Sequence, residues 1–236
     1  MHTSLRRKFP LLLRVATHLG ALIPLAILVW DYQTNHLTVN PIQAAEQRTG
    51  IIALVLVLLS LACTPLNTLF RFSQAIQRRR ALGLYAFFYA SLHLFIFTVV
   101  DYGLDWPTLW QLLSEKRYIA AGLATFVILA ALAATSTRGW MKRMGKGWKR
   151  LHQLVYLAGM LAILHFAWVI KGDVVRLGGD VLGPILYGTV LFLLLTLRIP
   201  GIRRGIVYAR QRIINGRTLA KLRQVGHLKV DKIEPL

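Results

Sequence analysis

Long apolar runs alternate with short charged segments along this chain, and this pattern predicts its architecture. Six runs are marked by their content of aliphatic residues and phenylalanine: residues 11–30, 51–69, 81–101, 118–135, 150–169 and 181–198. A helix needs about 20 mostly apolar residues to cross the hydrocarbon core of a bilayer. The runs are continuous, which favours helices over the alternating strands of a membrane barrel. We therefore predict an all-α membrane protein, a six-transmembrane-helix bundle, in which no internal repeat is evident.

After the last run the sequence becomes basic and amphipathic. Isoleucine and valine residues recur among arginines from Ile202 to Ile214. Such a pattern is typical of a helix that lies on a membrane surface, and Asn215-Gly216 is a helix-ending signal. We divide the chain into a transmembrane domain at residues 1–200 and a basic cytoplasmic tail at residues 201–236. A docking face for a cytosolic partner is an alternative role for this tail.

The distribution of charge predicts how the bundle is oriented. Most of the 29 lysines and arginines lie at the N-terminus, after the second and fourth runs, and in the tail, while most of the nine acidic residues lie in the other connections. Basic residues are enriched on the cytoplasmic side of membrane proteins, so both termini are expected in the cytoplasm (N-in/C-in). The net charge of +20 therefore indicates attraction to anionic membrane lipid and not to nucleic acid.

Composition limits the available chemistry. Apolar residues make up 56% of the chain, and Cys63 is its one cysteine. A single cysteine excludes an intrachain disulfide and a cysteine-based zinc or iron–sulfur site. The N-terminal apolar run has no clear small-x-small cleavage site, so we interpret it as a retained span and not as a signal peptide.

Histidines inside the apolar runs are the strongest candidates for function, because an ionisable side chain in hydrocarbon usually has a partner. At about 1.5 Å per helical residue, His93 lies roughly 20 Å beyond Arg80, and His165 lies roughly 22 Å beyond Arg150. The third and fifth runs cross in the same direction, so these two histidines are nearly level. Two imidazoles from different helices at one depth are what a bis-histidine b-type haem requires.

A second pair of histidines is expected near the cytoplasmic surface. His152 begins the fifth run, and His18 lies roughly 6 Å beyond Arg14. This pair could bind a second haem or line a quinone or flavin site. The 13 positions between His152 and His165 correspond to about 220° of rotation, so the two rings face different ways unless the helix bends near Gly159.

Simpler roles compete with these interpretations. A histidine at the end of a span can be an interfacial anchor or part of an interhelical hydrogen bond. Zinc would need three or four clustered ligands, and a proton relay would need deep acidic residues, which the runs lack. Trp140 and Trp148 fit interfacial aromatic residues. Gly122, Gly159 and Gly188 fit close helix packing, and the alternative is that one of them lies against a porphyrin face.

Several segments occur in a characteristic order: THLGALIP, CTPLNTLF, RRRALGLYAFFYASLHLF, LAATSTRGW, MGKGWKRLHQLVYL and ILHFAW. Together they resemble the MsrQ (YedZ) family, haem-binding membrane subunits within the ferric-reductase-like transmembrane superfamily. The resemblance extends from about Thr17 to Arg198. It depends on the combination of segments, since each one alone is short.

The resemblance implies that His93, His152 and His165 ligate haem b, with FMN as a further cofactor. It implies an electron-transfer subunit of an oxidoreductase system, not the catalytic subunit, in the inner (cytoplasmic) membrane of a bacterium. The implied partner is MsrP, a periplasmic molybdoenzyme that repairs oxidised methionines in proteins. The implied electron donor is the quinone pool or a cytosolic flavin reductase.

Two other functions remain as alternatives. A ferric or cupric reductase-like haem protein would share the haem core but usually needs a fused flavin and nicotinamide domain, which we do not find here. A proton-coupled transporter could use the histidines for protons, but the sequence lacks the acidic residues at the midplane and the broken repeat helices that we would expect.

Overall fold

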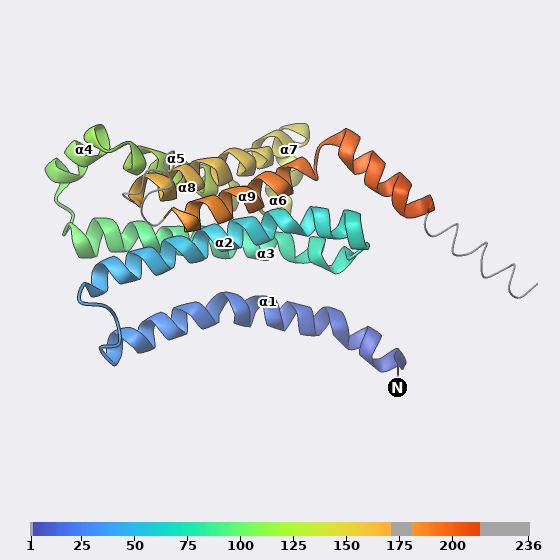
Figure 1. Cartoon of the computed structure of the whole chain (residues 1–236), viewed down its shortest axis with the longest axis horizontal. Helices are drawn as coiled ribbons and strands as arrows, with labels where there is room; N and C mark the ends of the chain where they lie inside the picture. The colour runs from blue at the N-terminus through green and yellow to red at the C-terminus, as the bar shows by residue number, and fades with distance from the viewer. Residues whose placement is uncertain (1, 171–180, 213–236) are drawn as a thin grey trace, which may run out of the picture.

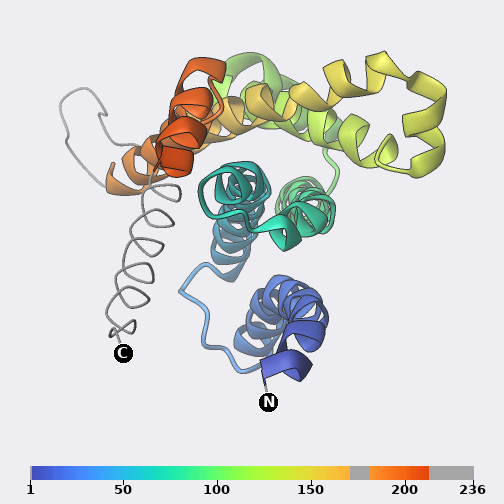
Figure 2. The same ribbon diagram turned by 90° about the vertical axis from the view of Figure 1, so that its right-hand side faces the viewer.

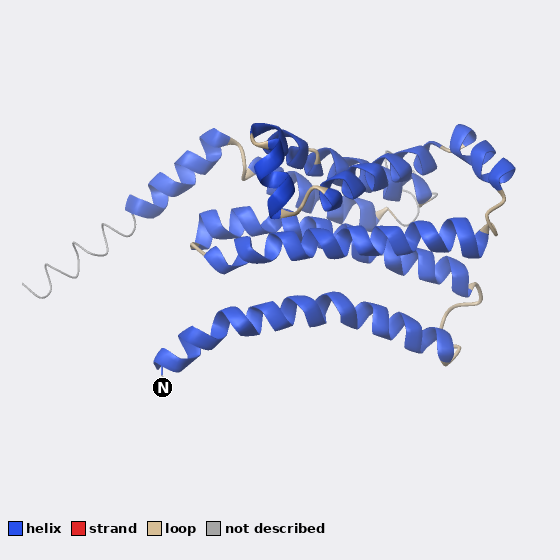
Figure 3. Cartoon of the chain, turned by 180° about the vertical axis from the view of Figure 1, so that it is seen from behind, coloured by secondary structure: helices blue, strands red, loops and turns tan. Residues whose placement is uncertain are grey.

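The computed structural model describes residues 2–170 and 181–212, and this part of the chain is helical, without strands (Figures 1 and 3). Its elements are α1 (His2–Gln33), α2 (Pro41–Phe70), α3 (Ser73–Phe95), the π-helical turn η1 (Ile96–Asp101), α4 (Trp106–Glu115), α5 (Arg117–Ala134), α6 (Arg138–Met144), α7 (Lys146–Gln153), α8 (Val155–Val169) and α9 (Leu182–Thr196). A further helix, Pro200–Arg212, follows α9. The predicted all-α architecture is confirmed.

The helices are arranged in three layers (Figure 2). Helix α1 forms one outer layer and packs on α3 and α2. Helices α2 and α3 form an antiparallel pair in the middle, and α5, α8 and α9 form the third layer. The middle pair therefore contacts both outer layers, and it supplies most of the buried core.

Within residues 2–170 and 181–212, five helices are long and apolar enough to cross a membrane: Phe9–Gln33, Pro41–Phe70, Ser73–Asp101, Arg117–Ala134 and Lys146–Val169. Helix α9 and the helix Pro200–Arg212 pass the same test together, but they are bent by 74° where they meet. The chain is thus a multi-pass membrane protein with five or six candidate spans. The predicted tail helix begins within the described residues, whereas its expected end at Asn215-Gly216 lies outside them.

The basic segments gather at one end of the bundle (Figure 1). The N-terminus, the α2–α3 connection, α6, α7 and the helix Pro200–Arg212 lie at this end, whereas the α1–α2 connection and α4 lie at the opposite end. Antiparallel spans of this kind are what the charge pattern requires. The assignment of the basic end to the cytoplasm stays a prediction.

The observed helices differ from the predicted runs at several boundaries. Helix α2 starts at Pro41 and not near residue 51, because the side chain of Asn40 caps it by accepting a hydrogen bond from the backbone N–H of Gln43, and Pro41 occupies a first-turn position. The α-helical hydrogen bonding over residues 150–169 is interrupted at Leu154, between α7 and α8, but Lys146–Val169 together form one candidate span. Gly159, where a bend was one alternative, lies inside the continuous helix α8.

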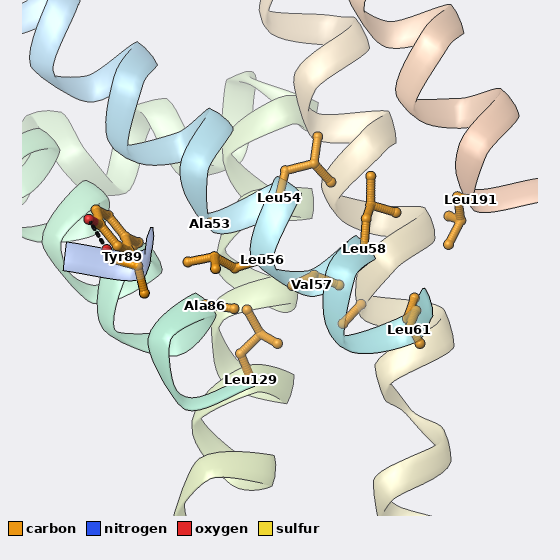
Figure 4. Packing of buried hydrophobic residues seen from close by; sticks show 12 residues of the cluster. Ala53, Leu54, Leu56, Val57, Leu58, Leu61, Ala86, Tyr89, Leu129 and Leu191 are labelled. Atoms are coloured by element: carbon orange, nitrogen blue, oxygen red, sulfur yellow. Dashed lines mark hydrogen bonds between the residues drawn. The ribbon is translucent and has the colours of Figure 1, made fainter. Parts of the chain in front are cut away.

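The buried core lies where the middle pair meets its neighbours (Figure 4). Leu61, Ala86 and Tyr89 have no exposed surface. The hydroxyl of Tyr89 donates a hydrogen bond to the backbone carbonyl of Ala21 at 2.6 Å, which fastens α1 to α3. In hydrocarbon such a bond satisfies a hydroxyl that has no water to bind.

A proline in α2 is matched by an arginine that follows α9. Pro65 has no backbone N–H, so the carbonyl of Leu61, four residues earlier, lacks its usual helical donor. The guanidinium of Arg198 donates to this carbonyl at 2.5 Å and to the hydroxyl of Tyr156 at 2.6 Å. Arg210 likewise donates to the carbonyl of Thr68 near the end of α2, at 2.6 Å. Two arginines thus attach the end of α9 and the helix Pro200–Arg212 to α2.

Candidate functional site

His93 on α3 and His165 on α8 lie next to one another, although 72 residues separate them in the sequence. Their ring centroids are 6.1 Å apart, and the ring planes are nearly perpendicular at 82°. The sequence predicted that these two residues share a depth, and the structure brings them into proximity. The π-helical turn η1 begins three residues after His93; such turns are frequent at functional sites.

Each of these imidazoles is anchored by a backbone carbonyl on a neighbouring helix. Nδ1 of His93 lies 2.9 Å from the carbonyl oxygen of Glu46 on α2. Nδ1 of His165 lies 2.7 Å from the carbonyl oxygen of Tyr118 on α5. A carbonyl can only accept, so Nδ1 carries the proton in both rings and Nε2 keeps its lone pair. This is the state in which a histidine ligates a metal.

The distance between the two rings fits a single metal ion between them. A metal–imidazole bond is about 2 Å long and the ring centroid lies about 1 Å behind the nitrogen, so two imidazoles on one metal have centroids about 6 Å apart. Among the residues that the structure describes, no three His, Cys, Asp or Glu side chains gather closely enough to hold a metal ion. A pair of histidines suits a metal whose other ligands come from a macrocycle, which is the haem case.

His152 differs from the first two histidines in the ring nitrogen that is hydrogen-bonded to the protein. The hydroxyl of Thr135 donates to the carbonyl of Ala131 at 2.7 Å and lies 3.2 Å from Nε2 of His152. The hydroxyl hydrogen is therefore in use, so Nε2 of His152 is the donor and carries the proton. The ring is also stacked on Trp148, with centroids 4.0 Å apart. His152 thus has its Nε2 committed to a protein partner.

His18 on α1 contacts α3 and not the His93/His165 pair. Its Nδ1 shares a hydrogen bond with the hydroxyl of Tyr85 at 2.9 Å, and the two rings meet edge to face. The contacts of His18 and His152 are with different residues, and no direct contact joins these two histidines. The expected level pair of His18 and His152, with a second haem or a quinone or flavin site, stays a prediction.

Three residues of the site were given a different role by sequence reasoning, or none. Trp148 was expected to be an interfacial aromatic residue, but it stacks on His152 and donates from its indole N–H to the carbonyl of Thr135 at 2.9 Å. The spacing of four between Trp148 and His152 on a helix was the available signal. Gly122 and Gly50 lie directly against the rings of His165 and His93, which no local pattern indicates.

Comparison with known proteins agrees with this architecture. The model of a family described as "Ferric reductase like transmembrane component" matches residues 49–163, a range that contains His93 and His152. A protein of Xanthomonas axonopodis pv. citri, named protein-methionine-sulfoxide reductase heme-binding subunit MsrQ, is 40% identical over 192 residues, which cover 79% of this chain and 85% of the relative. This chain belongs to the MsrQ family.

Other members of the MsrQ family match to a similar extent. The MsrQ protein of Bordetella pertussis is 42% identical over 180 residues, covering 76% of this chain and 85% of its own. That of Xanthomonas oryzae pv. oryzae is 39% identical over 188 residues, covering 77% and 83%. The resemblance to MsrQ proteins that the sequence motifs indicated is thus confirmed over most of the chain.

Proposed function

We propose that this member of the MsrQ family carries electrons across a membrane through a haem b held between His93 and His165. One observation supports the assignment above all others: two imidazoles from different helices, each anchored through Nδ1, lie 6.1 Å apart. The names of the relatives, which describe heme-binding subunits, support haem as the cofactor.

The protein's own groups would perform two tasks at this site. The carbonyl oxygens of Glu46 and Tyr118 accept the Nδ1 protons of the two histidines, which fixes the ring orientation and makes each imidazole a stronger electron donor. The surrounding helices keep both rings partly buried, which limits the access of water. Haem, when bound, supplies an iron that alternates between ferric and ferrous states inside an insulating bilayer.

His152 and His18 are proposed to belong to the end of the bundle where electrons are received. His18 follows Arg14 by four residues and His152 follows Arg150 by two, and the charge pattern predicts that these basic segments face the cytoplasm. A second haem, a quinone or FMN are the ligands that we consider for this end. Basic residues in the adjoining connections would attract an anionic cofactor such as FMN. The chain would then consist of a haem-binding transmembrane domain at residues 1–200 and a cytoplasmic tail at residues 201–236.

The partners are proposed from the family. The printed name of the relatives refers to protein-methionine-sulfoxide reductase, so we propose that the acceptor is the catalytic subunit of such a system, the periplasmic molybdoenzyme MsrP. The donor is proposed to be the quinone pool or a cytosolic flavin reductase, with the bundle in the bacterial inner membrane. Reduction of the purified protein by a quinol or by a reduced flavin would tell these two donors apart.

The deciding experiment is a reduced-minus-oxidised absorption spectrum of the purified protein and of two variants, His93→Ala and His165→Ala. We expect a b-type spectrum in the parent, and in both variants the loss of the haem held by this pair, because each substitution removes one of its two proposed ligands. His36→Ala is the matched control, since His36 is an exposed loop residue whose Nδ1 contacts only Thr34.

Two outcomes would contradict the proposal. A parent protein that shows no haem spectrum after expression with sufficient haem would exclude the cofactor. A full spectrum in either alanine variant would exclude the His93/His165 pair and direct attention to His152 and His18.

A further inference from the structure

The imidazoles of His93 and His165 have surroundings of the same construction. In each, a carbonyl oxygen accepts from Nδ1, and the residue 47 positions before the histidine supplies that carbonyl. Four residues after the carbonyl, on the same helix, comes a glycine: Gly50 after Glu46, and Gly122 after Tyr118. Residues four apart lie on one face of a helix, so carbonyl and glycine are presented to the same ring.

Both glycines leave space that the imidazole occupies. A Cβ added at Gly122 would lie 2.8 Å from Nδ1 and 2.9 Å from Cε1 of His165. A Cβ added at Gly50 would lie 3.3 Å from the same two atoms of His93. The first contact is closer than real Cβ atoms tolerate, and the second is tight. Any larger residue would therefore push the ring away from its carbonyl.

The correspondence extends beyond the surroundings of the two histidines. When 72 is subtracted from the residue numbers of α5 and α8, these helices align with α2 and α3 in the same chain direction. Every buried residue of α5 then corresponds to a buried residue of α2. The pairs are Thr49 with Ala121, Ala53 with Thr125, Val57 with Leu129, and Ser60 with Leu132. Ala86 and Ala158, both without exposed surface, correspond as well. The two halves of the core are thus built on one plan.

From this shared construction we infer that Gly50 and Gly122 are paired positioning residues, which hold the imidazoles of His93 and His165 against the carbonyls of Glu46 and Tyr118. The inference rests on the proposed haem ligation. It assigns the two glycines to the rear of the ligand rings and not to general helix packing. It also predicts unequal effects of substitution, because the space at Gly122 is smaller than the space at Gly50.

The same register explains why His152 stands apart. The residue that corresponds to His152 under the shift of 72 residues is Arg80 and not a second histidine. Only the His93/His165 level therefore has a histidine in both halves of the repeated plan.

Three alanine variants test the inference: Gly122→Ala, Gly50→Ala and Gly159→Ala. Gly159 is the matched control, because a Cβ there would lie 3.3 Å from a methyl group of Leu191, as tight as the contact at Gly50 but away from both histidines. Haem affinity is measured by transfer to apomyoglobin. The haem that remains bound is characterised by its low-spin ferric EPR signal, which depends on the orientation of the imidazole planes, and by its midpoint potential.

We expect Gly122→Ala to weaken haem binding about tenfold or more, the range seen when partners of metal-ligating histidines are removed. Gly50→Ala should bind haem with a smaller loss, a changed EPR signal and a more positive midpoint potential, because a weaker Nδ1–H···O bond makes the imidazole a poorer donor. Gly159→Ala should keep the EPR signal and potential of the parent. If Gly122→Ala fails to fold, Gly50→Ala alone decides.

Failure of this inference can be distinguished from failure of the proposed function. Haem could be lost in His93→Ala and His165→Ala while the EPR signal and potential of Gly50→Ala match those of Gly159→Ala. The ligand assignment would then be supported, and the positioning role of the glycines would be wrong. If the two histidine variants keep their haem, the ligand assignment is wrong and the inference fails with it.

Discussion

Hydrogen bonding distinguishes the histidines of this chain more sharply than their positions do. His93 and His165 donate from Nδ1 to backbone carbonyls, which leaves Nε2 as an acceptor. His152 donates from Nε2 to a threonine whose own hydrogen is in use. The two tautomers differ in which nitrogen can bind a metal. Histidines that look equivalent in the sequence thus differ in which ring nitrogen is free to bind a metal.

At the residue scale, His152→Ala is expected to keep the haem spectrum that depends on His93 and His165. The physical reason is that Nε2 of His152 is bound to Thr135 and its ring to Trp148, so its removal leaves the other two ligands in place. The measurement is the reduced-minus-oxidised spectrum beside that of His165→Ala. Complete loss of haem in His152→Ala would show that His152 ligates the same iron.

At the scale of elements, the end of α2 depends on a residue far along the chain. Pro65 deprives the carbonyl of Leu61 of its helical donor, and the guanidinium of Arg198 replaces that donor. Arg198 also lies over the ring of Tyr156, with its Cζ 5.1 Å from the centroid. Because an unpaired carbonyl is costly in an apolar environment, the arginine and the proline are energetically coupled.

We predict that Arg198→Leu lowers the free energy of unfolding by about 1–3 kcal/mol, the cost of leaving buried polar groups unpaired. Adding Pro65→Ala to this variant should recover part of the loss, because a backbone N–H at position 65 can donate to the carbonyl of Leu61. Denaturant unfolding in detergent micelles measures both effects. Arg203→Leu is the control, since Arg203 is exposed on the last helix and a surface change should stay within about 0.5 kcal/mol.

The coupling has a clear counter-result. Equal stability losses in Arg198→Leu with and without Pro65→Ala would mean that the arginine acts through Tyr156 or its charge alone, and not through the carbonyl that the proline frees.

At the scale of the whole molecule, the bundle has two unlike ends. The connections that carry most of the basic residues lie together (Figure 1). The carbonyl-anchored histidines lie near the opposite ends of their helices, His93 in the last turn of α3 and His165 near the end of α8. If the basic end faces the cytoplasm, electrons enter there and leave near His93 and His165. The direction of electron flow therefore depends on the orientation of the chain in the membrane.

Orientation can be checked with single cysteines placed at the two ends of the molecule. In a Cys63→Ala background, Thr38→Cys lies in the exposed α1–α2 connection, and Gln77→Cys is exposed near the start of α3. We expect a membrane-impermeant maleimide to label Thr38→Cys in intact spheroplasts and to label Gln77→Cys only after lysis. The reverse labelling pattern would contradict the N-in/C-in orientation.

Much of this architecture can be predicted from the local sequence. Long apolar runs can satisfy their backbone groups in a bilayer only as helices, so the positions of the spans followed from hydropathy. The depth of His93 and His165 followed from the fixed rise of a helix, and the family followed from ordered motifs. These properties depend on neighbouring residues along the chain, and a linear pattern therefore determines them.

Only the tertiary structure decided which partners the histidines have. Every residue type has a backbone carbonyl, so no sequence pattern identifies the carbonyls of Glu46 and Tyr118 as the hydrogen-bond acceptors of the two rings. Gly50 and Gly122 became positioning residues because another helix brings an imidazole to within van der Waals distance. The correspondence between the two halves was hidden for the same reason. It resides in backbone contacts and burial, which different side chains can satisfy equally well.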